Sequence, residues 1–216
     1  MPPQPGRHIL TINTGSSSLK AGLYWADGGD LALQTSVLAE RIGLPEARFR
    51  AFGESGKEIP VESRDLSDFG SALQAVFDEV GRQQIDAIGH RVVHGGSRYA
   101  QPERVGAELL DALRALVPVD PMHLPQAIDS IESASRMVPG IPQVACFDTA
   151  FHRSMPRVAQ IYALPRELTD AGVVRYGFHG LSCESILDQL RKLGEPLVAG
   201  RVVIAHLGNG ASMTAV

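Results

Sequence analysis

A pattern of strand, turn and strand occurs twice in the chain, once near each end, and this repetition limits the possible folds. Near the amino terminus, an apolar run leads into small polar residues around Gly15 and then into a second apolar run. The same order recurs around Gly208, and a shift of one residue then aligns Ser18 with Ser212. Short matches of this kind also arise by chance. A duplication predicts two related halves, each built around one such hairpin.

Between these ends, apolar runs typical of strands alternate with apolar positions at helical spacing. Helices are expected over residues 67–81, 109–117, 128–138 and 181–193, and strands over 85–93, 143–147 and 201–205. Ser67 is the expected N-cap of the first helix and Gly81 its end. Residues 25–65 show only weak alternation, which predicts short strands and loops. Strands separated by helices indicate an α/β or mixed α+β class.

Composition excludes several classes of protein. The 216 residues carry 20 Lys and Arg against 24 Asp and Glu, a net charge of -4 that gives no general attraction to nucleic acid or to an anionic membrane. The two cysteines, Cys146 and Cys183, have neither disulfide-scaffold nor zinc spacing. The polar amino terminus and the lack of a long apolar run predict a protein that is neither secreted nor embedded in a membrane. A reducing cytoplasm is therefore expected.

The two turns have the composition of phosphate-binding loops. Residues 13–20 and 206–210 are rich in Gly, Ser and Asn, which leave backbone N–H groups open to an anion, and the first segment adds Lys20. An ordinary hairpin turn is the alternative for either segment. Neither segment is a Walker loop or a dinucleotide fingerprint.

Three further residues could carry chemistry. Arg91 ends a strand beside a glycine turn, where its guanidinium could bind a phosphate or carboxylate, although a surface arginine fits equally. Asp148 directly follows a buried strand and could hold a metal or simply cap a turn. His179 lies between aromatic residues and a glycine. It could be an active-site histidine or a buried structural histidine. His90 and His94 are four apart in a strand, a spacing that argues against a shared metal ion.

Taken together and in order, these segments closely resemble the motifs of the acetate kinase family. The five matching segments are Asn13–Lys20, Gly89–Gly96, Cys146–His152, Arg175–Gly180 and His206–Ser212. The resemblance implies the α/β, ribonuclease-H-like fold of the sugar-kinase, Hsp70 and actin superfamily, with duplicated halves. Residues 1–147 would form the first half, with the acyl and phosphate site. Residues 148–216 would begin a nucleotide-binding second half that this chain does not complete.

The resemblance also implies an activity and its residues. The family reversibly transfers the γ-phosphoryl group of ATP to acetate, giving acetyl phosphate and ADP, with Mg²⁺ or Mn²⁺; its full-length members suggest a homodimer. By position, Arg91, Asp148 and His179 match catalytic residues, and Arg91 also contacts substrate. The remaining matches are Val93, Met122, His123 and Phe178 for substrate, Ser16, Ser18, Lys20, His206, Asn209 and Gly210 for phosphate, and Asn13 for metal.

Departures from the family pattern leave alternatives open. Leu124 stands where the family has an amide, which puts local hydrogen bonding and acyl-chain preference in doubt. Cys183 stands where the family has a histidine. Propionate or butyrate could be the substrate, because one methylene changes binding by only about 1–3 kcal/mol. Family members are also much longer, and their adenosine pocket, second catalytic arginine and metal-associated glutamate are not matched here. A noncatalytic fragment that binds phosphate or a partner chain is the other alternative.

Overall fold

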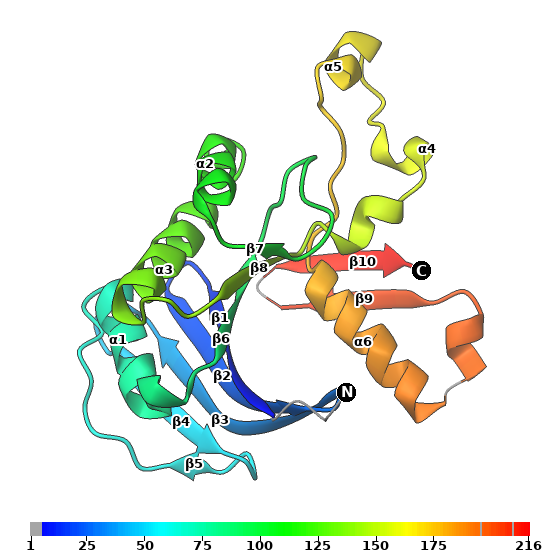
Figure 1. Ribbon diagram of the computed structural model, residues 1–216. Helices are drawn as coiled ribbons and strands as arrows, with labels where there is room; N and C mark the ends of the chain where they lie inside the picture. The colour runs from blue at the N-terminus through cyan, green and yellow to red at the C-terminus, as the bar shows by residue number, and fades with distance from the viewer. Residues whose placement is uncertain (1–5, 195, 209) are drawn as a thin grey trace. The chain divides into compact units, whose positions relative to one another are not determined.

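The computed structural model describes residues 6–194, 196–208 and 210–216. Figure 1 shows the elements along the chain. The strands are β1 Arg7–Thr14, β2 Ser18–Asp27, β3 Asp30–Glu40, β4 Arg48–Gly53, β5 Glu58–Ile59, β6 Ala87–Val92, β7 Glu103–Arg104, β8 Gln143–Phe147, β9 Val203–Leu207 and β10 Ala211–Ala215. The α-helices are α1 Phe69–Val80, α2 Ala107–Leu116, α3 Leu124–Met137, α4 Arg157–Gln160, α5 Arg166–Asp170 and α6 Gly180–Leu193, and the 3₁₀ helices are η1 Arg82–Gln84, η2 Phe151–Ser154 and η3 Pro196–Ala199. Over the described residues, no helix has both the length and the apolar character needed to cross a bilayer.

The chain divides into two compact units. Unit 1 comprises residues 1–92 and 102–146, and unit 2 comprises residues 93–101 and 147–216. The chain thus leaves unit 1 after β6, contributes a short loop to unit 2, and returns before the final crossing after Cys146. The assignment of residues 1–147 and 148–216 to two evolutionary halves stays a prediction.

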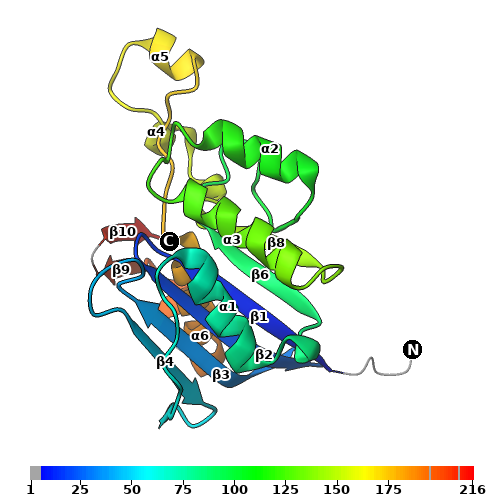
Figure 2. The same cartoon turned by 90° about the vertical axis from the view of Figure 1, so that its left-hand side faces the viewer.

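Unit 1 is built on an eight-stranded sheet of order β5-β4-β3-β2-β1-β6-β8-β7. The strands β1 to β5 follow one another in antiparallel pairs, whereas β1 and β6 are parallel and α1 lies between them in sequence. The helices α1 and α3 cover one face of this sheet, as the two views in Figures 1 and 2 show. The predicted α/β class is confirmed by this alternation of strands and covering helices.

Side-chain alternation explains which face is covered. On β1 and β6 the side chains of Leu10, Ile12 and Ile88 are part of the apolar core. Val92, on the same face of β6, is also buried. Their neighbours in sequence point to the opposite face, because successive side chains of a strand alternate. Polar residues of β1 and β6, such as Asn13 and Arg91, therefore lie on the face away from α1 and α3.

Two local expectations in unit 1 were wrong. The N-cap of α1 is Asp68 and not Ser67: the Asp68 carboxylate accepts the backbone N–H of Ser71 at 2.7 Å. The helix does end at Gly81, whose positive φ of 78° suits a residue without Cβ. Within residues 25–65, β3 is eleven residues long and not a short strand. It is sandwiched between β2 and β4 in the sheet, so pairing on both sides stabilises a strand whose own pattern is weak.

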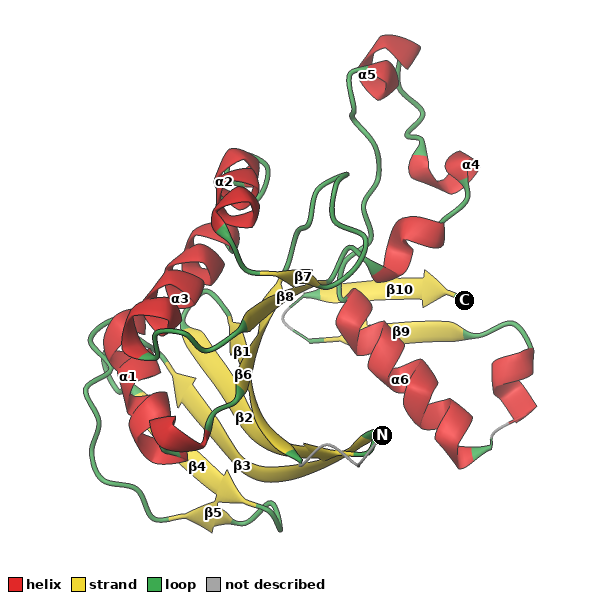
Figure 3. Cartoon of the chain, in the orientation of Figure 1, coloured by secondary structure: helices red, strands yellow, loops and turns green. Residues whose placement is uncertain are grey.

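Unit 2 combines long connections with one helix and one hairpin. Figure 3 shows mostly loop between η2 and α6, interrupted by the short helices α4 and α5. The strands β9 and β10 form a two-stranded antiparallel sheet. One face of it packs on α6 through Ile204, Cys183 and Leu187. A strand is expected over residues 201–205, and β9 lies there; its side chains alternate, so that Ile204 is buried whereas Val203 and Leu207 are exposed.

The repeated pattern of strand, turn and strand is confirmed as local structure. The strands β1 and β2 form one antiparallel hairpin, and β9 and β10 form the other. In the first, Gly15 donates its N–H to the Ser18 carbonyl at 2.8 Å, and a Cβ at Gly15 would lie 2.7 Å from Ser18 Oγ. A larger residue at this position would therefore require the Ser18 hydroxyl to move.

Candidate functional site

The predicted site residues divide between the two units. Unit 1 carries Asn13, Ser16, Ser18, Lys20, Arg91, Met122 and His123. Unit 2 carries Val93, Asp148, Phe178, His179, His206 and Gly210. Asn209 lies outside the described residues.

In unit 1, strand pairing gathers polar side chains at the β1–β2 turn. Asn13 and Lys20 are direct cross-strand partners, which places their side chains on the same face of the sheet. Ser16 is exposed in the turn, Ser18 is half-buried, and Lys20 is exposed at the start of β2. The turn thus presents hydroxyl groups and one ammonium group, which can act as hydrogen-bond donors to an anion.

Arg91 joins this group from the neighbouring parallel strand. Its Nη1 donates to Asn13 Oδ1 at 3.0 Å. The pairing of Ile12 with His90 in the parallel ladder brings β6 alongside β1 at this height. A guanidinium and an ammonium group thus flank one small-residue turn, and both favour a negatively charged ligand.

His90, one residue earlier, points to the opposite, covered face. It is 2% exposed, and its Nε2 lies 2.6 Å from Gln143 Oε1. The ring nitrogen is the donor, because an amide oxygen can only accept. Burial lowers the pKa of His90 to about 4 from 6.5, against the smaller opposing effect of the Gln143 hydrogen bond. Gln143 in turn donates to Ser135 Oγ at 2.7 Å. His90 is therefore part of a buried, neutral network under the sheet.

The segment before α3 holds two further predicted residues. His123 is the N-cap residue of α3, and its Nδ1 lies 2.8 Å from Asp120 Oδ1. Met122 beside it is 63% exposed. Leu124, the residue that departs from the family pattern, is fully buried and begins the helix. Replacing an amide by leucine at this position therefore adds apolar surface to the interior of unit 1.

In unit 2, the segment after β8 is held tightly. Asp148 and Thr149 are each 1% exposed, and Thr149 Oγ1 accepts the N–H of Gly95 at 3.0 Å. The Asp148 carbonyl accepts the N–H of Gly180 at 3.1 Å. A Cβ at Gly180 would lie 2.0 Å from that carbonyl oxygen, so only glycine lets α6 begin this close to Asp148. The predicted catalytic acid therefore has a fixed backbone.

His94 links the short loop of unit 2 to the segment of Phe178. The His94 ring is 2% exposed and contacts Tyr176 and Phe178, with centroid distances of 4.5 and 5.7 Å. Its Nδ1 accepts the N–H of Gly96 at 2.8 Å. Phe178 is 39% exposed and Val93 is half-buried. Phe178 thus belongs to the aromatic cluster around His94, and Val93 precedes His94 in the same loop.

Two imidazole rings stack at the start of α6. His179 and His206 have centroids 4.0 Å apart and an interplanar angle of 12°. His179 Nδ1 lies 2.9 Å from Ser212 Oγ, and His206 Nδ1 lies 3.3 Å from Ser182 Oγ. A Cβ at Gly210 would lie 3.4 Å from His179 Nε2, so the ring extends over the β9–β10 turn. The structure brings His179, His206 and the described part of the second turn together.

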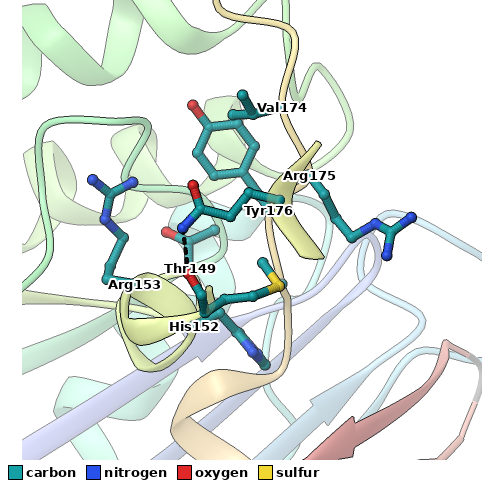
Figure 4. Close-up of a pocket in the computed structure, with 9 residues that line it drawn as sticks. Thr149, His152, Arg153, Val174, Arg175 and Tyr176 are labelled. Atoms are coloured by element: carbon teal, nitrogen blue, oxygen red, sulfur yellow. Dashed lines mark hydrogen bonds between the residues drawn. The ribbon is translucent and has the colours of Figure 1, made fainter. Parts of the chain in front are cut away.

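A small pocket in unit 2 lies next to these residues in sequence but does not include them. It is lined by Thr149, His152, Arg153, Met155, Gln160, Val174, Arg175, Tyr176 and Gly177. In Figure 4 the side chains of Arg153 and Arg175 point away from each other, so their charges do not converge on a ligand. His152 Nε2 contacts the Phe178 carbonyl at 2.9 Å. One residue that lines the pocket, His152, thus holds the backbone of Phe178 in place.

Sequence reasoning missed the residues that hold the site residues in place. Thr149, His94 and Ser212 contact the backbone or side chains of predicted site residues or of their neighbours. A signal existed for Ser212, because the repeated pattern aligns it with Ser18. Thr149 and His94 lie inside matching segments, but contacts between distant segments cannot be read from either one.

The described residues contain no group of three or more His, Cys, Asp or Glu side chains arranged to hold a metal ion. Cys146 and Cys183 are free thiols. Mg²⁺ usually takes one or two protein carboxylates and fills its remaining positions with water and phosphate oxygens. Asp148 offers the oxygens of a carboxylate, whereas Asn13 offers the oxygen of a neutral amide. The donor chemistry of Asp148 fits such an ion better than that of Asn13.

A family model described as the acetokinase family matches residues 8–216. The curated acetate kinase of Methylocella silvestris is 41% identical over 227 residues, covering 97% of this chain and 55% of that protein. The acetate kinase of Deinococcus radiodurans is 44% identical over 215 residues, covering 96% and 52%. The chain therefore spans about half the length of the curated relatives it matches.

Solved structures agree with these matches. The crystal structure of Porphyromonas gingivalis acetate kinase is similar with a TM-score of 0.81 and 32% identity, covering 97% of this chain and 55% of that chain. A propionate kinase from Francisella tularensis has a TM-score of 0.82 and 33% identity, covering 97% and 54%. Both similarities extend over both units.

Proposed function

The chain belongs to the acetokinase family, and we propose from this membership that it supplies the carboxylate- and phosphate-binding residues of an ATP-dependent acetate kinase. The reaction is the reversible transfer of the γ-phosphoryl group to acetate, giving acetyl phosphate and ADP. Since the chain spans about half the length of its relatives, this activity is proposed for the protein with a complete second half. The observation that carries the proposal is the pair of small-residue hairpins, each flanked by side chains suited to an anion.

The chemistry asked of these residues is mainly electrostatic. Acetate is already ionised near neutral pH, since carboxylic acids titrate around pH 4, so no base is needed to activate it. The obstacle is the repulsion between this anion and the phosphoryl group. Arg91 would screen that repulsion and orient the carboxylate, with Asn13 fixing the guanidinium through their hydrogen bond. Ser16, Ser18 and Lys20 would bind phosphate oxygens at the same turn.

Unit 2 would supply the second set of contacts. His179 would donate from Nε2 to the transferring phosphoryl group, and the β9–β10 turn, with His206, Asn209 and Gly210, would bind nucleotide phosphates. Asp148 would position the nucleotide-bound divalent cation, Mg²⁺ or Mn²⁺. When bound, that cation neutralises charge that develops on the phosphate oxygens. Asn13 as a metal-associated residue remains a sequence-based expectation.

The acyl specificity is the second candidate function. Val93, Met122, His123 and Phe178 would contact the carboxylic acid, and the likeness to a propionate kinase favours testing longer acids. Leucine at position 124 changes the interior beneath Met122 and His123, which gives a physical reason for a shifted preference. Comparing kcat/KM for acetate, propionate and butyrate decides between these substrates.

Three further expectations accompany the function. A cytoplasmic location, a homodimer of the full-length form, and the absence of nucleic-acid or membrane partners are proposed from composition and family resemblance. The alternative of a noncatalytic fragment predicts binding of ATP or acetyl phosphate without turnover.

Hydroxamate trapping of acetyl phosphate tests the proposal. The assay contains acetate, ATP and Mg²⁺ with either the 216-residue chain or a full-length form, meaning the chain extended to the length of its relatives. Turnover by the full-length form supports the enzyme. Calorimetry with ATP then tests whether a chain without turnover still binds nucleotide. No hydroxamate from either protein would contradict the catalytic proposal.

A further inference from the structure

The backbone of His179 is held in an unusual conformation. Its φ and ψ angles of 57° and 24° are left-handed, a region that residues other than glycine adopt uncommonly. The next residue, Gly180, is fixed by its hydrogen bond to the Asp148 carbonyl. Strain of this kind persists only where surrounding contacts impose it, and it is concentrated at functional sites.

The His179 side chain is held by a cross-strand pair of the hairpin. Ser212 on β10 lies directly opposite His206 on β9, so both side chains project from the same face toward α6. The His179 ring stacks flat on His206, while its Nδ1 lies 2.9 Å from Ser212 Oγ. Stacking fixes the plane of the ring, but it permits rotation within that plane and a flip of the ring. The hydrogen bond to Ser212 removes this freedom.

The contact with Ser212 has a consequence for the proton on the ring. In a neutral imidazole one nitrogen is a donor and the other an acceptor, and the partner of one sets the state of the other. If the Ser212 hydroxyl donates to Nδ1, the proton of neutral His179 lies on Nε2. This nitrogen extends toward Gly210 in the turn between β9 and β10. A phosphate group at that turn would then meet a hydrogen-bond donor.

We propose that Ser212 is a positioning residue that donates its hydroxyl hydrogen bond to His179 Nδ1 and thereby holds the ring as the Nε2–H tautomer over the β9–β10 turn. The catalytic consequence rests on the proposed function, because it assumes that His179 contacts the phosphoryl group. The tautomer itself does not, and it can be measured in the chain without any turnover.

The direct test is long-range ¹H–¹⁵N NMR of the 216-residue chain labelled with ¹⁵N-histidine. Spectra are recorded at pH 8.5, above the ordinary imidazole pKa of about 6.5. His179→Gln identifies the His179 signals by their disappearance. We expect a pyrrole-type Nε2 and a pyridine-type Nδ1 in the original chain and in Ser212→Thr, and a tautomer mixture in Ser212→Ala. Ser185→Ala, which removes an exposed hydroxyl on α6, should match the original chain.

Kinetics of the full-length form give the second readout. Ser212→Ala should lower kcat roughly tenfold, with KM for acetate changed less than about twofold, and Ser212→Thr should restore kcat. A protonated Nδ1 in neutral His179, or an unchanged tautomer in Ser212→Ala, would overturn the proposal. An expected tautomer change with an inactive full-length form would leave Ser212 as the positioning residue and contradict only the proposed function.

Discussion

At the scale of single residues, the candidate site depends on side chains that are held by others. Arg91 is fixed by Asn13, and His179 by Ser212 and His206. Such contacts matter because phosphoryl transfer relies on alignment and charge more than on covalent chemistry. Replacing a positioned residue should therefore affect turnover more than folding.

Arg91 gives the clearest case. Arg91→Ala in the full-length form should lower kcat/KM for acetate by about two orders of magnitude, because it removes the cation that faces two anions. Arg91→Lys should recover only part of this loss, since an ammonium group cannot form a bidentate contact. Hydroxamate formation measures the effect. Arg191→Ala, at an exposed ion pair of α6, is the control and should retain activity; unchanged turnover in Arg91→Ala would remove Arg91 from the mechanism.

His90 predicts a pH dependence of stability. Its pKa is about 4 in the folded chain, below the ordinary 6.5, so the folded chain keeps the ring neutral while the unfolded chain protonates it. The resulting stability is present above about pH 6.5 and is lost as the pH falls toward 4. Between pH 7 and pH 5 this group should cost about 2 kcal/mol of the free energy of unfolding.

Urea unfolding at pH 7 and pH 5 measures that loss. The glutamine of His90→Gln does not titrate in this range because its amide is neutral, so the loss between the two pH values should shrink by about 2 kcal/mol. The comparison uses the difference between two pH values and is insensitive to a constant destabilisation of the variant. An equal loss in both proteins would show that His90 does not cause the pH dependence.

At the scale of elements, the amino-terminal end of helix α1 has two adjacent candidate caps, and the backbone conformation decides between them. Asp68 and not Ser67 caps the helix. Asp68→Ala should therefore lower the free energy of unfolding by about 1 kcal/mol, whereas Ser67→Ala should change it by less than about 0.5 kcal/mol. Urea unfolding of the two variants checks this. A larger effect at Ser67 than at Asp68 would contradict the assigned cap.

Elements with a strong apolar period could be predicted from the sequence. Elements whose extent depends on strand pairing could not. Helices α1, α2, α3 and α6 and the two hairpins follow from apolar spacing and glycine turns. The length of β3 does not, because a central strand gains its stability from neighbours on both sides. Adjacent residues such as Ser67 and Asp68 are both good caps, and only the backbone distinguishes them. Likewise, Ser212 could be aligned with Ser18, but its contact with His179 spans 33 residues.

At the scale of the whole molecule, family membership follows from ordered segments distributed over both units. No single segment distinguished a phosphate loop from an ordinary turn, whereas their order across the chain did. The chain covers about half the length of its curated relatives, and its β9–β10 hairpin keeps Val203, Leu207 and Met213 exposed. The reaction is therefore proposed for the full-length form and not for this chain alone.

Phosphoryl transfer to acetate is measured most directly by ³¹P NMR of the full-length form with ATP, Mg²⁺ and acetate. We expect a new acyl-phosphate resonance that grows together with ADP and depends on acetate. The same sample with acetyl phosphate and ADP should produce ATP, because the transfer is reversible. If ADP appears together with inorganic phosphate at the same rate with or without acetate, and no acyl phosphate forms, the protein does not transfer the phosphoryl group to acetate.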